Sequence, residues 1–334
     1  MSDPADSSLS MQKTGRIPVV PAATAVVDRA GAEPDPPRRV VMSDDRKAQR
    51  RLAYWLIGPA ALVMLAVTAY PIVYAAYLSF FDSKLSAPGD DTFIGFGNYR
   101  TVLKDHVWWS AVSTTALITV VSVIIEFVLG LALALVMHRT LIGRNLVRTT
   151  VLIPYGIVTV AAAISWKYAW TPGTGYLARL LPDSSAPLAE HWPAIGVIIL
   201  AEVWKTTPFM ALLLLAGLAL VPDDILKAAQ VDGAGAWTRL IKVTLPLMKS
   251  AILVALLFRT LDAFRIFDNI LVLTNGQNGT ASVSKYGYDI TKNLDVGLGS
   301  AVSILIFGLV AVIVVVFVYG FGASAPGADS DERK

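Results

Sequence analysis

The chain has 334 residues, of which 55% are hydrophobic and only 16% are charged, and its mean hydropathy is +0.59. Soluble domains carry about 25% charged residues, so this composition excludes a water-soluble globular protein and predicts a membrane protein. The absence of cysteine excludes disulfides, thiolate metal sites and a cysteine nucleophile, and basic cytosolic loops account for the net charge of +3 without nucleic acid as a partner.

Residues 1–45 form a first segment without any long apolar run, rich in Pro, Ala, Asp and Arg. Such a composition cannot bury enough apolar surface to fold, and it predicts a disordered cytosolic tail. The segment also lacks the apolar core of a secretory signal peptide. We therefore expect no cleavage, and expect the first hydrophobic span to start membrane insertion.

Six apolar runs follow, each long enough for the roughly 20 helical residues that cross a bilayer. They cover residues 54–78, 109–137, 147–170, 193–221, 250–273 and 298–321. Only helices satisfy all backbone polar groups inside lipid at these lengths. The predicted fold class is therefore all-α, a polytopic six-transmembrane-helix bundle, in which Pro71, Pro154, Pro208 and Gly217 mark positions where helices can bend.

The Lys and Arg residues of the loops are divided unequally, with eleven on the side of the two termini and six on the other. Cytosolic loops carry the excess of positive charge, so both termini are expected in the cytosol. The sequence thus predicts a multi-pass domain over residues 50–321 in the inner or plasma membrane, followed by a cytosolic C-terminal tail at 322–334. The loop between spans four and five, residues 222–249, should be cytosolic.

Span four contains an acid, a base and two aromatic rings close together: Glu202, Trp204, Lys205 and Phe209. A sugar site uses this mixture, because charged groups hydrogen-bond to hydroxyls while rings cover the apolar faces of a pyranose. The alternative is an ion-pair network that holds helices together. Glu126, alone in span two, fits that structural alternative better than a place in a cavity.

The cytosolic loop, LKAAQVDGAGAWTRLIKVTLP, indicates two short helices separated by a turn. Pro222 and Asp223 provide a start signal, Gly233 interrupts the run, and Asp232 is placed to cap the second helix. We expect Pro246 to stop that helix. Small residues leave the surface nearly bare at the turn, so another protein could approach closely: Ala228, Ala229, Gly233 and Ala234.

The second of these helices is amphipathic, with its apolar residues at helical spacing. This pattern alone is equally consistent with a helix that lies on the lipid headgroups. The apolar face consists of Trp237, Leu240, Ile241 and Leu245.

Span five carries four ions at steps of three, and an amide next to the last of them: Arg259, Asp262, Arg265, Asp268 and Asn269. An ion at the middle of the bilayer costs about 2.5 to 3.5 kcal/mol, so these residues must face protein or a water-filled path. The spacing allows neighbours to pair within the helix. Steps of three also drift around a helix, so the four ions should not all point into one cavity. The alternative is again a network that locks helices together.

No nucleotide or metal chemistry is indicated on this chain. The dipeptide Gly-Lys is absent, so there is no phosphate-binding loop, and neither HExxH nor GxSxG occurs. The three histidines, His106, His138 and His191, do not form a metal constellation. We expect no bound cofactor and no enzymatic activity.

The cytosolic loop resembles the "EAA" loop of ATP-binding-cassette (ABC) import permeases, in which Glu-Ala-Ala precedes Asp-Gly-Ala and Ile-x-Leu-Pro. Two positions depart from that pattern, because Lys227 replaces the Glu and Val243 the Ile. FIGFGNY at residues 93–99 and LTNGQNG at 273–279 are similar to outer segments of sugar-type members, which extends the resemblance to most of residues 50–321. The matching positions of the loop are Lys227, Ala228, Ala229, Asp232, Gly233, Ala234, Leu245 and Pro246.

The resemblance implies a type I ABC importer permease fold and a set of partners. These are a second permease, two copies of a cytosolic ATPase that holds ATP and Mg, and an extracytoplasmic sugar-binding protein. It also implies that the loop couples the ATPase to the spans, which alternate access to a neutral sugar, with a disaccharide of the trehalose type favoured. Two other classes compete: a secondary transporter or channel for a polar solute, and a membrane enzyme. ATP dependence separates the first of these from an importer.

Overall fold

The computed structural model describes residues 43–86, 89, 91–139, 144–182 and 185–320. This part of the chain is almost entirely helical, which agrees with the all-α prediction. Its only paired strands form a short antiparallel hairpin of β1 (Phe81–Asp82) and β2 (Thr92–Phe93). The two predicted tails lie outside the described residues, apart from residues 43–45, where helix α1 begins.

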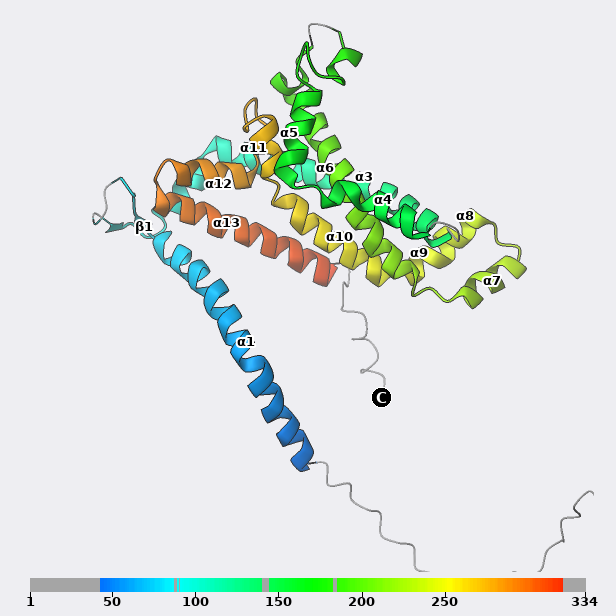
Figure 1. Cartoon of the computed structure of the whole chain (residues 1–334). Helices are drawn as coiled ribbons and strands as arrows, with labels where there is room; N and C mark the ends of the chain where they lie inside the picture. The colour runs from blue at the N-terminus through cyan, green and yellow to red at the C-terminus, as the bar shows by residue number, and fades with distance from the viewer. Residues whose placement is uncertain (1–42, 87–88, 90, 140–143, 183–184, 321–334) are drawn as a thin grey trace, which may run out of the picture. The chain divides into compact units, whose positions relative to one another are not determined.

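The chain separates into two compact units, Met1–Leu62 and Val63–Lys334. Helix α1 (Ser43–Leu78) crosses the boundary between them, and every other element belongs to the second unit (Figure 1). In chain order these elements are α2 (Gly97–Lys104), α3 (His106–Arg139), α4 (Arg144–Gly156), α5 (Thr159–Ala169), the 3-10 turns η1 (Ala178–Leu180) and η2 (Pro187–Ala189), α6 (His191–Leu218), α7 (Asp223–Val231), α8 (Ala236–Arg239), the π-helical turn η3 (Leu240–Thr244), α9 (Leu245–Leu247), α10 (Lys249–Phe264), α11 (Asp268–Leu273), α12 (Val283–Lys292), α13 (Val296–Val315) and the π-helical turn η4 (Val316–Gly320).

Four helical segments of the described chain are long and apolar enough to cross a membrane: Tyr54–Leu78, His106–His138, His191–Leu218 and Val296–Gly320. Two further candidates are pairs of helices joined at sharp bends. Arg148–Gly156 meets Thr159–Ala169 at 87°, and Ala236–Leu247 meets Lys249–Leu273 at 74°. Counting each bent pair as one span gives six, the number that the sequence predicts.

Two of the predicted spans are interrupted helices. The run 147–170 breaks at Ile157 and Val158, shortly after Pro154, which cannot donate a backbone hydrogen bond to the preceding turn. The run 250–273 breaks at residues 265–267, where neither Pro nor Gly occurs. The first break agrees with the bend that Pro154 indicated, whereas the second was not predicted, and each break lies beside the cavity described below.

Helix α6 is the centre of the second unit. In its most apolar window 61% of the residues are buried, against 11% in α13. Glycines allow the neighbouring helices to approach it closely, as is common in membrane bundles. A Cβ on Gly130 of α3 would lie 2.8 Å from Met210 Cγ, and a Cβ on Gly217 would lie 2.5 Å from Ala251 Cβ of α10. Helices α3 and α10 thus pack closely against α6 at these two glycines.

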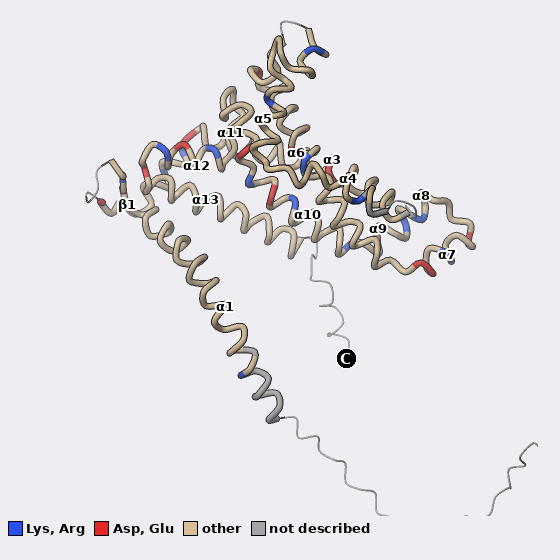
Figure 2. The backbone as a smooth tube through the Cα atoms, viewed as in Figure 1, with Lys and Arg blue, Asp and Glu red and all other residues tan. Residues whose placement is uncertain are grey.

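Charged residues of the second unit include one group on α10, α11 and α12 and another on α7, α8 and η3 (Figure 2). Helix α13 has no charge along its length. The amphipathic helix α12 and the short helix α2 were not predicted, because neither is long enough to cross a bilayer. Within α12, buried Lys285 pairs with Asp289 at 2.5 Å, and a 2.6 Å hydrogen bond from Tyr286 to Asp105 holds the helix against the start of α3.

Candidate functional site

A polar cavity of about 440 Å³ lies between α4, α5, α6, α10 and α11. The breaks in the two interrupted spans shape its wall. Tyr155 and Thr159 line it from the two sides of the 87° bend, and Ile266 and Phe267 line it from the break between α10 and α11. We call this the central cavity. Because its polar side chains come from interrupted helices and from the most buried helix, they face one another instead of lipid.

Six of the nine residues predicted for a substrate path line the central cavity. Two remain outside the lining as aromatic supports: Phe209 stacks on Tyr155, with ring centroids 5.2 Å apart, and Trp204 makes an edge contact with Trp166. The third, Arg259, is fully buried beneath the cavity. The six lining residues are Glu202, Lys205, Asp262, Arg265, Asp268 and Asn269.

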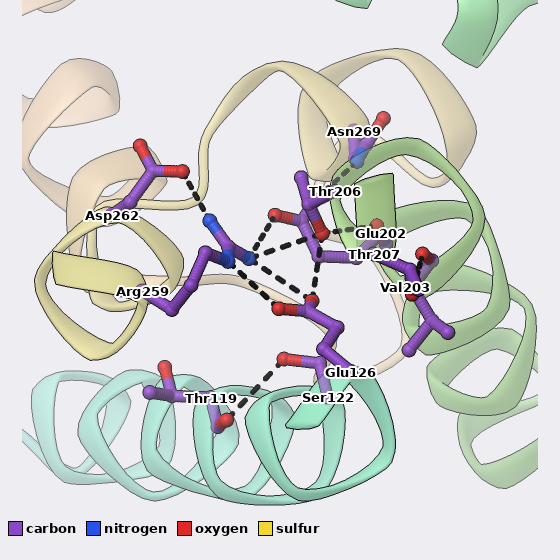
Figure 3. A network of polar contacts seen from close by, with 10 residues as sticks. All are labelled: Thr119, Ser122, Glu126, Glu202, Val203, Thr206, Thr207, Arg259, Asp262 and Asn269. Atoms are coloured by element: carbon purple, nitrogen blue, oxygen red, sulfur yellow. Dashed lines mark hydrogen bonds and ion pairs between the residues drawn. The ribbon is translucent and has the colours of Figure 1, made fainter. Parts of the chain in front are cut away.

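Arg259 is the centre of a buried ion cluster that connects α3, α6 and α10 (Figure 3). Its Nε lies 2.7 Å from Glu126 Oε2, and its Nη2 lies 3.0 Å from Glu126 Oε1 and 3.5 Å from Glu202 Oε1. Its Nη1 pairs with Asp262 one turn along the same helix. Arg259 and Glu126 both have 0% exposure, so the guanidinium neutralises a carboxylate that no water reaches.

Two neutral residues complete the hydrogen bonding of this cluster. The Thr206 hydroxyl accepts from Arg259 Nη2 at 3.1 Å and lies 2.7 Å from Glu126 Oε1. On the cavity side, Asn269 Nδ2 donates to Glu202 Oε2 at 2.7 Å. Glu202 therefore faces two ways, with one oxygen toward Arg259 and the other held by an amide at the cavity wall. A satisfied buried network of this kind fixes its members in a single arrangement.

Other charges at the central cavity have no ion-pair partner within the described part of the chain. These are the side chains of Lys205, Arg265 and Asp268. Lys205 Nζ instead lies 5.6 Å from the centroid of the Tyr155 ring, a cation–π arrangement. The pairing expected along span five is thus present for Arg259 and Asp262 but does not continue to Arg265 and Asp268, because the helix breaks between them.

Sequence reasoning missed part of the cavity and one long-range pairing. Tyr155, Thr159 and Thr206 carry no charge, and hydroxyl groups are too common in apolar spans to single them out. Glu126 was predicted to lie outside a cavity, and it does not line the central cavity. Its pairing with Arg259, 133 positions further along the chain, was not predicted. This pairing favours a structural role for Arg259 over a place in the substrate path.

The predicted cytosolic loop is a helical pair with a glycine turn. Helix α7 ends in a Schellman arrangement, in which Ala234 N–H donates to Ala229 O and Gly233 N–H to Gln230 O. Gly233 has φ +80°, a left-handed conformation that favours glycine, and nothing lies within 4 Å of the position that its Cβ would occupy. Arg239 Nη1 donates to Gln230 Oε1 at 2.8 Å and ties α8 to α7. The small residues of the turn are therefore presented openly.

One local prediction for this loop is wrong. Asp232 does not cap the second helix, because it ends α7 and Gly235 takes the N-cap position of α8. The predicted stop at Pro246 is confirmed to within one residue: the helical run from Ala236 ends at Leu247, and a 74° bend at Met248 separates it from α10. Lys227 lies 3.7 Å from Asp224 in an exposed pair.

Comparison with known proteins gives a consistent family. Residues 126–323 match the model of the binding-protein-dependent transport system inner membrane component. The chain is 64% identical over 312 residues to the trehalose transport system permease protein SugA of Mycobacterium tuberculosis, covering 93% of this chain and 97% of that one. It is 38% identical over 268 residues to the trehalose/maltose transport system permease protein MalF of Thermococcus litoralis, covering 78% and 90%.

The fold has a solved counterpart in a bacterial ABC transporter involved in the import of the acidic polysaccharide alginate. The TM-score is 0.71 at 22% identity, with 83% of this chain and 97% of that chain covered.

Proposed function

The chain belongs to the family of binding-protein-dependent transport system inner membrane components, and on that premise we propose that it forms half of the membrane path of an ATP-driven importer for a neutral disaccharide, trehalose. The relatives named for trehalose transport support this substrate. A second permease would supply the other half of the path. The central cavity is then where the sugar crosses.

The observation that carries this proposal is the balance of groups around the central cavity. Its lining combines three carboxylates, two cations and an amide with the rings of Tyr155 and Phe267. Two of the carboxylates, Glu202 and Asp262, are already bonded to Arg259. A phosphorylated or anionic substrate would favour a surplus of Arg and Lys, because oxyanions use charge-assisted donors. A balanced set with aromatic faces suits a neutral polyhydroxyl compound.

The loop of α7 to α9 is proposed as the contact with the ATPase. The open turn at Ala228, Ala229, Gly233 and Ala234, with Lys227 and Asp232 beside it, would lie in a groove of that subunit. Leu245 and Pro246 continue through the bend at Met248 directly into α10, which carries Arg259 and Asp262. Movement of the loop would therefore be transmitted to a helix that lines the cavity.

The remaining parts of the assembly follow from the same proposal. ATP and Mg belong to two copies of the ATPase, an extracytoplasmic sugar-binding protein delivers the substrate, and this chain carries no cofactor. The chain lies in the inner or plasma membrane with a permease domain over residues 50–321, and both termini, including tails 1–45 and 322–334, are in the cytosol.

The substrate is tested by deleting the gene and measuring uptake of labelled trehalose, maltose and glycerol 3-phosphate. We expect trehalose uptake to be lost and restored by the wild-type gene, with uptake of glycerol 3-phosphate unchanged. Unchanged trehalose uptake alongside loss of another substrate would overturn the assignment. Uptake by proteoliposomes without ATP, driven by an ion gradient, would instead favour a secondary transporter.

Asp262→Asn should lower transport while the complex stays assembled. The Asp262 side chain is 66% exposed and lines the central cavity, so a neutral near-isostere changes the cavity wall without emptying a buried site. Trehalose uptake per assembled complex is the measurement. Asp82→Asn is a matched control, because that half-buried aspartate pairs with Lys84 outside the cavity. Loss of assembled complex with normal uptake per surviving molecule would assign Asp262 to the scaffold.

A further inference from the structure

A second polar hollow, of about 450 Å³, lies between the end of α5 and the loop that joins α11 to α12. The proposed orientation places it on the outer face, and we call it the outer hollow. Its polar wall is formed by Lys167, Trp170, Thr171, Thr274, Asn275, Gln277 and Asn278. These described residues bring an indole ring, three amides, two hydroxyls and one amine together without a carboxylate.

The backbone of the loop of residues 274–280 has a defined conformation. Asn275, Gly276, Asn278 and Gly279 all have left-handed backbone conformations, with φ between 54° and 74°. The buried hydroxyls of Thr274 and Thr280 are 2.7 Å apart and close the base of the loop. Strained backbone persists only where surrounding contacts determine it, and it is concentrated at functional sites.

Neighbouring helices anchor the same loop from outside. Thr114 of α3 donates to Gly279 O at 3.1 Å, and His191 Nδ1 lies 2.8 Å from Asn278 O at the start of α6. The backbone carbonyls of Asn278 and Gly279 thus bind the loop to α6 and α3, and the amide side chains remain available to a ligand. The backbone of the loop is therefore preorganised, which reduces the entropy lost when a ligand binds.

The amide side chains of the outer hollow have no hydrogen-bond partner within the described part of the chain, whereas the Thr171 hydroxyl donates to Lys167 O. Asn275, Gln277 and Asn278 are exposed at the surface, and their amides are therefore accessible to a ligand. Trp170 Nε1 is buried and also without an acceptor. An unsatisfied buried donor costs about 1 to 3 kcal/mol, so this group calls for an explanation. Trp170 lines the outer hollow, so a ligand oxygen there would accept from this nitrogen once the ring rotates slightly.

We propose that the outer hollow is a binding subsite for the transported sugar before it enters the central cavity. Each amide can donate to one hydroxyl and accept from a neighbouring one, which matches vicinal hydroxyl groups on a pyranose. The Trp170 ring offers an apolar face and a donor together. The wall does not favour a cation, because it has no carboxylate, and the single amine of Lys167 is too little for a phosphate.

Helices α5 and α11 each line the central cavity near one end and the outer hollow near the other. Helix α5 contributes Thr159 to the central cavity and Lys167 near its other end to the outer hollow, and α11 contributes Asp268 to the first and Leu273 to the second. At 1.5 Å per residue the two sites are about 8 to 12 Å apart along these helices. A sugar released from the outer hollow would therefore move a short way along α5 and α11 to reach the central cavity.

The subsite rests on the proposed function, since it deepens the path of the same sugar. The test uses the complete importer in proteoliposomes, with ATP inside and trehalose-loaded binding protein outside. Gln277→Ala and Trp170→Phe each remove one hydrogen-bonding group while keeping the backbone and, for Trp170, an aromatic ring. Trehalose imported and ATP hydrolysed are both measured, so that sugar transfer is separated from stimulation of the ATPase by the binding protein.

We expect each substitution to lower trehalose import about fivefold, the effect of one net hydrogen bond, with stimulated ATP hydrolysis unchanged. Asn293→Ala and Tyr176→Phe are the matched controls, because they remove an amide and a polar donor from exposed residues outside the hollow. Both should import normally. A diazirine derivative of trehalose should also label the wild-type chain at 167–171 or 274–278.

Unchanged import by a variant that carries both Gln277→Ala and Trp170→Phe, or labelling confined to the central cavity, would overturn the subsite and leave the proposed function standing. A parallel fall in stimulated ATP hydrolysis would show that these residues contact the binding protein instead. Absence of trehalose import by the wild-type complex would overturn the proposed function and the subsite with it.

Discussion

Replacing Gly233 with leucine is expected to abolish ATP-driven uptake while the chain stays inserted at normal abundance. The turn after α7 is open, with nothing within 4 Å of the Cβ position, so a leucine side chain would project into the space where the ATPase is proposed to dock. The left-handed backbone at φ +80° adds a second penalty, because leucine rarely adopts it. The measurement is trehalose uptake together with the yield of ATPase copurified with the permease.

Three control variants separate these two penalties. Gly233→Asn tolerates the left-handed backbone, so retained coupling there would indicate that strain is the main effect in the leucine variant. Gly308→Leu adds the same bulk on α13, where open space surrounds the Cβ position, and should leave uptake intact. Asp232→Ala should be milder than Gly233→Leu, because it adds no bulk at the turn and Gly235, not Asp232, is the N-cap of α8. Copurification of Gly233→Leu with the ATPase at wild-type yield would contradict the docking proposal.

Local sequence patterns predicted most of the helical framework. Apolar runs long enough to span a bilayer gave six spans, and the glycine turn of the cytosolic loop is present where Gly233 indicated it. These features depend on neighbouring residues only: hydropathy sets the spans, and the absence of a Cβ sets the turn. The same reasoning found the six charged or amide residues that line the central cavity, since ions inside a bilayer must face protein or water.

What sequence reasoning missed depends on contacts between distant residues. The break at residues 265–267 contains neither Pro nor Gly, so nothing local indicates it. By contrast, Pro246 indicates the bend that follows at Met248. The partner of Arg259 is another example, because helical spacing relates it to Asp262 and cannot reveal Glu126 on a different span. Local patterns thus predict that the ions are inside, but not which of them face the path.

Arg259→Met is expected to prevent assembly of the permease, whereas Arg265→Met should lower transport and leave assembly intact. Removing the guanidinium of Arg259 leaves Glu126 at 0% exposure without a cation, and Glu202 loses one of its two partners. Breaking a buried ion pair from one side costs about 3 to 5 kcal/mol, a large part of the stability of most proteins. Arg265 lines the central cavity, is exposed and has no ion pair within the described residues, so the same substitution there removes no buried partner.

Assembly is measured as the fraction of chain that elutes with its partners in size-exclusion chromatography, and transport as trehalose uptake per assembled complex. The triple variant Glu126→Gln, Glu202→Gln and Arg259→Met provides the decisive comparison. It removes the cation and both buried carboxylates, and replacing a whole buried ion network is often neutral, so assembly should largely return. Asn269 can still donate to the amide oxygen that replaces Glu202 Oε2 in this variant, which keeps the cavity wall in place. Normal assembly of the single Arg259→Met variant with loss of uptake would instead place Arg259 in the sugar path.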